Sequence, residues 1–193
     1  MAMSTARPST LPELQRLLVV GGGGREHALA WAPGRCPDIE TVWVSPGNGG
    51  SGPHQASVAE DDAEGLIHHC REQAIDLVVV GPEAPLAAGV ADALRAAGLA
   101  VFGPGADGAL LEASKAWAKQ LMQDAGVPTA GHWAVDSEAQ ALAVLEQVNR
   151  PLVVKADGLA AGKGVTVADT VAEAEAAIRA AFAGRFGNAG SHL

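Results

Sequence analysis

The sequence is poor in aromatic residues: tyrosine is absent, and all aromatic residues together make up 4% of its 193 positions. Apolar residues nevertheless reach 48%, which is enough for one or two modest hydrophobic cores. Without large rings, those cores must be filled by Ala, Val and Leu, and the 24 glycines are expected where the backbone approaches something closely. The composition excludes a disordered chain and a collagen-like fibre.

Cysteine is equally scarce, with Cys36 and Cys70 as its two occurrences. Two such distant residues form neither a disulfide framework nor a metal-binding knuckle. We therefore expect a protein of the reducing cytoplasm in which each cysteine is a small buried hydrophobe.

Positive charge is limited too: 13 Lys and Arg stand against 22 Asp and Glu, for a formal net charge of −9. Nucleic-acid binding requires a basic face, so no nucleic-acid partner is expected. Apolar runs such as Leu17–Val20 and Leu77–Val80 are far shorter than the roughly 18 residues that span a bilayer, so no membrane partner is expected either. Residues 1–15 lack an apolar segment and are predicted to be a disordered tail, with an organelle-targeting segment as the alternative.

Short apolar runs alternate with helical stretches over residues 16–107, a pattern that predicts βα units around a parallel sheet. This is an α/β fold with a Rossmann-like domain, in which ligand loops follow the carboxyl ends of the strands. The expected strands are Leu17–Val20, Thr41–Val44, Leu77–Val80 and Leu99–Phe102. The expected helices are Arg25–Trp31, a segment capped by Asp61 that runs to about Gln73, and Leu86–Ala97.

After residue 107 the order of the expected strands and helices changes. Residues 108–130 are predicted as a linking helix, with its helical core at Leu110–Ala125, and residues 131–193 as a small α+β subdomain. The elements expected there are a short strand at His132–Val135, a helix capped by Ser137, strands Leu152–Lys155 and Val165–Val167, and a helix at Val171–Ala183 capped by Thr170.

Four consecutive glycines, Gly21, Gly22, Gly23 and Gly24, follow the first expected strand and open a helix. At such a position free backbone N–H groups and the helix dipole can hold an anion. The dinucleotide fingerprint fails, because its third glycine would stand where Glu26 or His27 stands. The alternative is a tight turn without a ligand, which would not need the polar run Arg25, Glu26 and His27.

Glu83 follows the third expected strand, so it should lie at the same sheet edge as the tetraglycine loop. A carboxylate there can accept hydrogen bonds from a sugar hydroxyl or an amine. The alternative is an acid that stabilises the N-terminus of the next helix.

The chain has four lysines, and none precedes residue 115. Lys155 ends an apolar strand, and Lys163 sits in the glycine-rich turn that includes Gly158, Gly162 and Gly164. A lysine at a strand end beside a glycine-rich flap can contact phosphate oxygens while flap N–H groups cover them. The turn is not a Walker A loop, because Asp157 replaces its first glycine and Gly164 its Ser or Thr. The alternative is a solvated hairpin tip.

These motifs together resemble the phosphoribosylamine–glycine ligases, an ATP-grasp family of de novo purine synthesis. The resemblance runs the length of the chain. The residues that carry it are Gly23–Trp31, Pro46–Asn48, Val80–Leu86, Phe102–Pro104, Leu111–Lys115 and Val154–Val165.

The resemblance implies a pre-ATP-grasp domain that holds 5-phosphoribosylamine and a small ATP-grasp lid, Gly158–Gly164, over the nucleotide. It implies that ATP phosphates meet Lys115 and Lys155, and that ATP acts with Mg²⁺ or Mn²⁺. Glycine is the third substrate; its carboxylate becomes an acyl phosphate that the amine attacks. The implied ribosyl-substrate residues are Gly21, Gly22, Gly23, Gly24, Arg25, Glu26, His27, Pro46, Gly47, Asn48 and Glu83.

The sequence departs from the family in two places. Gly22 stands where the family usually has Asn, so a side-chain contact is missing. The chain also ends where the large ATP-grasp half with its metal ligands would begin, so we expect no metal ligands here, no assignable catalytic residue, and no ligase activity from this chain without that carboxyl-terminal part. The alternative function is a stand-alone, non-catalytic module that binds a phosphosugar or nucleotide.

Overall fold

A computed structural model describes residues 13–159, 164–185 and 192–193. The chain divides into two compact units, Met1–Gly105 and Ala106–Leu193. Most of the predicted tail, residues 1–12, lies outside the described residues. Its last residue, Gln15, is held in place: its carbonyl accepts from the Glu40 and Thr41 amides, and its own amide donates to Asp76.

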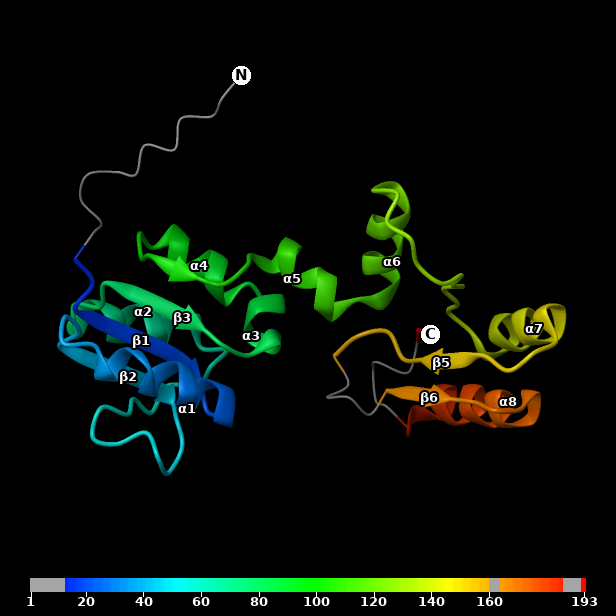
Figure 1. The fold of residues 1–193 in the computed structure, drawn as a ribbon, viewed down its shortest axis with the longest axis horizontal. Coiled ribbons are helices and arrows are strands. Elements are labelled where there is room, and N and C mark those ends of the chain that lie inside the picture. The colour runs from blue at the N-terminus through cyan, green and yellow to red at the C-terminus, as the bar shows by residue number, and fades with distance from the viewer. Residues whose placement is uncertain (1–12, 160–163, 186–191) are drawn as a thin grey trace, which may run out of the picture. The chain divides into compact units, whose positions relative to one another are not determined.

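The first unit contains one parallel sheet, with strands in the order β2-β1-β3-β4 (Figure 1). Its strands are β1 (Arg16–Gly21), β2 (Thr41–Pro46), β3 (Leu77–Val80) and β4 (Val101–Phe102). Leu17–Val20 on β1 are at most 6% exposed, as expected of a central strand covered on both faces. The predicted α/β class is therefore confirmed.

Helices connect these strands. They are α1 (Gly24–Trp31), the short 3-10 helix η1 (Pro33–Arg35), α2 (Ala63–Glu72), α3 (Glu83–Ala87) and α4 (Val90–Ala96). The single helix predicted at Leu86–Ala97 is wrong, because Gly89 adopts a left-handed φ of 84° that separates α3 from α4. The predicted cap Asp61 is also wrong: Asp62 accepts the Gly65 amide at the start of α2.

The second unit begins with two helices, α5 (Ala106–Ala113) and α6 (Lys115–Asp124). The continuous helix predicted at Leu110–Ala125 is wrong, because Ser114 leaves the helical conformation and caps α6 with its hydroxyl. No strand forms at residues 132–135, contrary to prediction. Instead Val135 exchanges two backbone hydrogen bonds with Leu193.

The rest of the second unit is a helix, an antiparallel hairpin and a further helix: α7 (Glu138–Val148), β5 (Val153–Lys155), β6 (Val165–Val167) and α8 (Val171–Ala180), extended by the π-helical turn η2 (Ala181–Arg185). Ser137 and Thr170 cap α7 and α8 as predicted. The core lies between these elements, where Leu145, Val154 and Ile178 are buried together. The opposite face of the hairpin remains exposed at Val153, Val165 and Val167.

The two cysteines differ in environment. Cys70 on α2 is buried, and burial raises the pKa of its thiol to about 11. Cys36 is exposed at the end of η1, so the prediction that it is a buried hydrophobe is wrong. Within the described ranges, every helix is too short or too polar to cross a lipid bilayer.

Trp43 on β2 lies between two histidine rings, edge to face with His54 at 5.2 Å and with His69 at 4.8 Å. The Nε2 atom of His69 is buried and finds no hydrogen-bond partner among the described residues. Burial lowers the pKa of His69 below its usual 6.5, because the charged imidazolium loses its hydration there. His69 is therefore a neutral member of the packing between α2 and β2.

Stability of the first unit is expected to fall with pH once the pH drops below about 6.5. The unfolded chain then protonates His69 while the folded chain does not, so protons favour unfolding until the pH reaches the lowered pKa. Urea unfolding between pH 7.5 and 5 measures this slope. His69→Phe should flatten it, because a phenyl ring keeps the contact with Trp43 but does not titrate, whereas His132→Gln in the second unit should leave it intact. An unchanged slope in His69→Phe would assign the pH dependence to another group.

Candidate functional site

The loops that follow β1 and β3 meet around one buried carboxylate, that of Glu26, which is 3% exposed. Its Oε2 accepts the Gly23 amide at 2.9 Å, and its Oε1 accepts Arg25 Nε at 2.6 Å. A Cβ atom added at Gly21, Gly23 or Gly81 would overlap the Glu26 side chain. Three glycines thus make room for Glu26, which fixes the shape of the loop from inside it.

Arg25 connects this buried carboxylate to an exposed one. Its Nη1 donates to Glu83 Oε1 at 2.7 Å, so Arg25 links Glu83 on α3 to the tetraglycine loop. Both lie at one edge of the sheet, as the sequence predicted. The Arg25 guanidinium holds the pKa of Glu83 below its usual range, and the hydrogen bonds to Glu83 and Glu26 raise the pKa of Arg25. Glu83 therefore stays ionised over the whole neutral range and presents a carboxylate to solvent.

The loop after β2 approaches the tetraglycine loop by direct backbone contact. The space of a side chain at Gly22 is occupied by the Gly47 carbonyl oxygen, 2.7 Å from the position of a Cβ. Asn48 Nδ2 donates to the Gly22 carbonyl at 3.0 Å. Gly22 therefore lies in close backbone contact with Gly47, and the Asn48 side chain holds the two loops together.

Pro46, which follows a cis peptide bond, and Gly47 form the start of this loop. Two further residues shape it that the sequence did not single out: Ser51 Oγ accepts the Asn48 amide at 2.7 Å, and Gln55 Nε2 donates to the Pro46 carbonyl at 2.6 Å. The sequence signal for Ser51 was its place two residues before Pro53 in a turn-rich segment, which predicts a loop but no particular bond.

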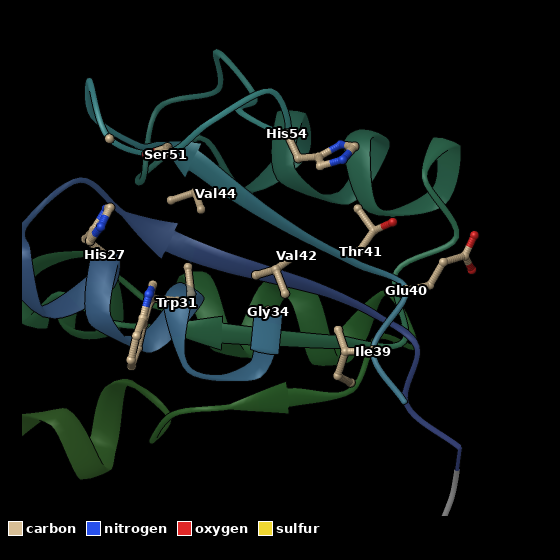
Figure 2. A pocket seen from close by; sticks show the side chains of 12 residues that line it. His27, Trp31, Gly34, Ile39, Glu40, Thr41, Val42, Val44, Ser51 and His54 are labelled. Carbon is tan, nitrogen blue, oxygen red and sulfur yellow. The ribbon is translucent and has the colours of Figure 1, made fainter. Parts of the chain in front are cut away.

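His27 does not join the Arg25–Glu83 pair. It lines a shallow cleft over β2 (Figure 2). Trp31 on α1 and His54 in the loop after β2 line the same cleft. Of the predicted substrate residues, His27 alone lines the cleft. The His27 ring lies next to Gly50 in the loop after β2, whose amide donates to Asn48 Oδ1 at 2.8 Å. His27 therefore faces the cleft beside that loop and, within the described residues, makes no hydrogen bond to the Arg25–Glu83 pair.

The predicted nucleotide residues lie in the second unit. Lys155 ends β5 with an exposed side chain and pairs across the hairpin with Val165. Lys115 begins α6, and its Nζ donates to the Gly158 carbonyl at 2.9 Å. Gly158 has a φ of 113°, a conformation that other residues rarely adopt, and the Gly164 carbonyl accepts the Ala156 amide at 2.7 Å. Gly162 and Lys163 lie outside the described residues.

Two residues that contact Lys115 and its helix were missed in the sequence. Ser114 carried an N-cap signal that the apolar periodicity of the surrounding segment concealed. In the sequence Asp157 stands out only as a departure from a Walker A loop, and its contact with α6 carried no signal, because its partners there are more than 40 residues away in sequence. In the described part of the chain, no three or more His, Cys, Asp and Glu side chains are grouped so as to hold a metal ion.

Comparison with known proteins gives two consecutive domain matches. Residues 15–112 match "Phosphoribosylglycinamide synthetase, N domain", and residues 113–193 match "Phosphoribosylglycinamide synthetase, ATP-grasp (A) domain". Proteins described as phosphoribosylamine–glycine ligase are 54% identical in Nostoc sp. over 182 residues and 48% identical in Escherichia coli K12 over 183 residues. Each alignment covers 92% of this chain and 43% of the relative, so the chain spans less than half the length of these proteins.

Comparison with solved structures also finds proteins of similar fold. The phosphoribosylamine–glycine ligase of Thermotoga maritima has a TM-score of 0.65 at 29% identity, covering 83% of this chain and 38% of that one. The biotin carboxylase domain of the Hydrogenobacter thermophilus 2-oxoglutarate carboxylase, solved with MgADP and bicarbonate, has a TM-score of 0.68 at 18% identity, covering 93% and 43%. The fold thus defines an α/β protein of the ATP-grasp class. Within that class, the chain belongs to the phosphoribosylglycinamide synthetase family.

Proposed function

We propose that this chain serves the ATP-dependent ligation of glycine to 5-phosphoribosylamine, which gives glycinamide ribonucleotide, ADP and phosphate through a glycyl acyl phosphate. The observation that carries the proposal is the uninterrupted succession of both family domains along one chain, at 54% identity to a named ligase. The reaction belongs to de novo purine biosynthesis, and a cytoplasmic location is part of the proposal. Nothing in the comparisons favours the alternative of a stand-alone binding module.

The first unit, in this proposal, binds 5-phosphoribosylamine at the carboxyl edge of its sheet. Glu83 accepts hydrogen bonds from the amine or a ribose hydroxyl, and Arg25 keeps its carboxylate ionised and oriented. Gly47 and Asn48 belong to the neighbouring loop. Glu26, buried inside the tetraglycine loop, fixes the backbone of that loop. His27 lies further along, in the cleft of Figure 2. The division into residues 16–107, 108–130 and 131–193 stays a prediction, whereas the two compact units of the structure divide between Gly105 and Ala106.

The second unit, in the same proposal, supplies part of the ATP site through Lys115 and Lys155. The protein's contribution to phosphoryl transfer is mainly positioning and electrostatic stabilisation, and two ammonium groups offset charge on the phosphate oxygens. In this proposal, ATP acts together with Mg²⁺ or Mn²⁺, and the MgADP bound in the solved biotin carboxylase domain supports Mg²⁺. The residues that hold the metal and complete catalysis are proposed to lie in the segment that the longer relatives have and this alignment does not cover.

Calorimetric titration of the chain tests both halves of the proposal. Ribose 5-phosphate, a stable stand-in for 5-phosphoribosylamine, and ATP with Mg²⁺ should each bind, and a coupled assay should detect no release of ADP. Binding of the sugar phosphate without any binding of ATP would favour the stand-alone module. Near-normal ADP release in the presence of glycine and 5-phosphoribosylamine would contradict the proposed division of the active site.

Glu83→Ala is expected to weaken ribose 5-phosphate binding by about tenfold, the loss typical of one hydrogen bond to a charged group. Because the pKa of Glu83 is lowered and its carboxylate remains ionised, Glu83 should add no pH dependence to the affinity between pH 8 and pH 5. The dependence caused by the ligand phosphate, which titrates at about pH 6, should therefore be the same in the unchanged chain and in Glu83→Ala. Glu72→Ala, which removes an exposed carboxylate on α2, is the matched control. Equal affinities in all three proteins would exclude Glu83 from the site.

A further inference from the structure

One carboxylate joins the end of strand β5 to the beginning of helix α6. Asp157 Oδ1 accepts the backbone amides of Lys115 at 2.5 Å and Ala116 at 3.2 Å. Asp157 Oδ2 accepts the Ser114 hydroxyl at 2.9 Å. These three contacts come from a residue more than 40 positions further along the chain, and nothing local to α6 replaces them.

The Asp157 contacts supply hydrogen-bond acceptors for amides at the start of α6 that have none within the helix. The first amides of a helix have no partner within it, and an anion there is stabilised by the helix dipole. Ser114 Oγ satisfies the Trp117 amide at 3.1 Å, and the Ser114 carbonyl accepts Ala118 in the first helical hydrogen bond. The remaining two amides depend on Asp157, so the conformation of Lys115 at the first position of α6 is set by this carboxylate.

The side chain of Lys115 returns to the residue after Asp157. Its Nζ donates to the Gly158 carbonyl at 2.9 Å, closing a ring of contacts around the Asp157–Gly158 peptide. An ammonium has three donors, so two remain for a ligand. The Asp157 strand end is itself fixed, because its amide donates to the His192 carbonyl at 2.8 Å.

We propose that Asp157 is a positioning residue of the nucleotide site, which holds Lys115 so that its ammonium meets phosphate oxygens. This inference rests on the proposed function, in which Lys115 binds ATP. Asp157 touches no phosphate itself: it acts through the backbone of Lys115 and Ala116. Without Asp157 the start of α6 is no longer fixed, and the Lys115 ammonium adopts many positions. Nucleotide binding must then order it, which lowers the affinity.

A double-mutant cycle separates this role from simple structural support. MgADP is titrated by calorimetry into the unchanged chain, Asp157→Ala, Lys115→Ala and the double variant. Asp157→Ala alone should weaken MgADP binding at least tenfold, and the same change should cost less than twofold when Lys115 is already Ala. Asp169→Ala, an exposed aspartate after β6, should bind MgADP as the unchanged chain does.

Amide hydrogen exchange supplies an independent readout. In Asp157→Ala, the Lys115 and Ala116 amides should exchange at least tenfold faster, and in Asp157→Asn, whose Oδ1 can still accept both, they should remain largely protected. An equal loss of MgADP affinity with and without Lys115, or no loss at all, would overturn the inference while leaving the proposed function intact. Failure of the unchanged chain to bind MgADP would overturn the nucleotide part of the proposed function, and the inference with it.

Discussion

Gly21→Ala should cost the first unit about 2 to 6 kcal/mol of folding free energy, a large part of the total for a domain of this size. Gly21 has a φ of 125°, which an alanine adopts only with strain of roughly 1–3 kcal/mol. The added methyl group would overlap Glu26 Cγ and lie 2.8 Å from Pro82 Cγ, and such overpacking costs a further 1–3 kcal/mol, roughly. Glu26 cannot withdraw without losing its hydrogen bonds to the Gly23 amide and Arg25 Nε.

Urea unfolding followed by circular dichroism measures this loss as a shift in midpoint. Gly24→Ala provides a control only three residues away: nothing lies within 4 Å of the position of its Cβ, and it begins helix α1. That variant should be as stable as the unchanged chain or more stable by up to about 1 kcal/mol, since alanine favours the helix. Similar losses in the two variants would refute the packing described around Glu26.

Lys155→Ala is expected to weaken nucleotide binding by about 1.5–3 kcal/mol, or roughly 10- to 150-fold, which is the contribution of a hydrogen bond to a charged group. The side chain is exposed at the end of β5, so its removal should leave thermal stability almost unchanged. A large effect on binding with a small one on unfolding is the pattern of a ligand contact. Titration with MgADP and a thermal melt on the same sample measure both.

Lys119→Ala is the matched control for this prediction. Lys119 lies on α6, where its Nζ donates to Thr129 Oγ1 at 2.5 Å and to the Ala130 carbonyl at 3.0 Å. Its ammonium is therefore engaged in tying α6 to the loop that follows. Nucleotide affinity should not change in Lys119→Ala, and unchanged affinity in Lys155→Ala as well would remove Lys155 from the site.

The strands were the most predictable part of the fold. The apolar run before Gly81 predicted β3 to the residue, because a strand covered on both faces of a sheet is continuously apolar. The bounds of β6 were also predicted, from β-branched residues after a glycine-rich turn, whereas the strand predicted at residues 132–135 does not form. The helix breaks at Gly89 and Ser114 escaped prediction, since apolar periodicity continues across both and a left-handed glycine inside a helical pattern has no separate signature.

For the site, the sequence placed Glu83 and the tetraglycine loop at one edge, which follows from the parallel order of the strands. It could not predict which side chains face solvent. Glu26 and Arg25 are adjacent in sequence, yet one is buried beneath the loop and the other spans to Glu83. Contacts between distant segments, such as Asp157 with α6, depend on the folded arrangement and leave no local pattern.

The packing of Glu26 among Gly21, Gly23 and Gly81 also restricts how this loop can change over evolution. A side chain at any of the three positions requires a smaller residue 26, and a smaller residue 26 leaves Arg25 Nε and the Gly23 amide without their acceptor, while the rest of the Arg25 guanidinium keeps its bonds to Glu83. The four positions are therefore coupled, and single substitutions among them face a barrier that paired substitutions avoid. Members of the family that carry a side chain at one of these glycines should accordingly have a residue smaller than glutamate at the position of Glu26.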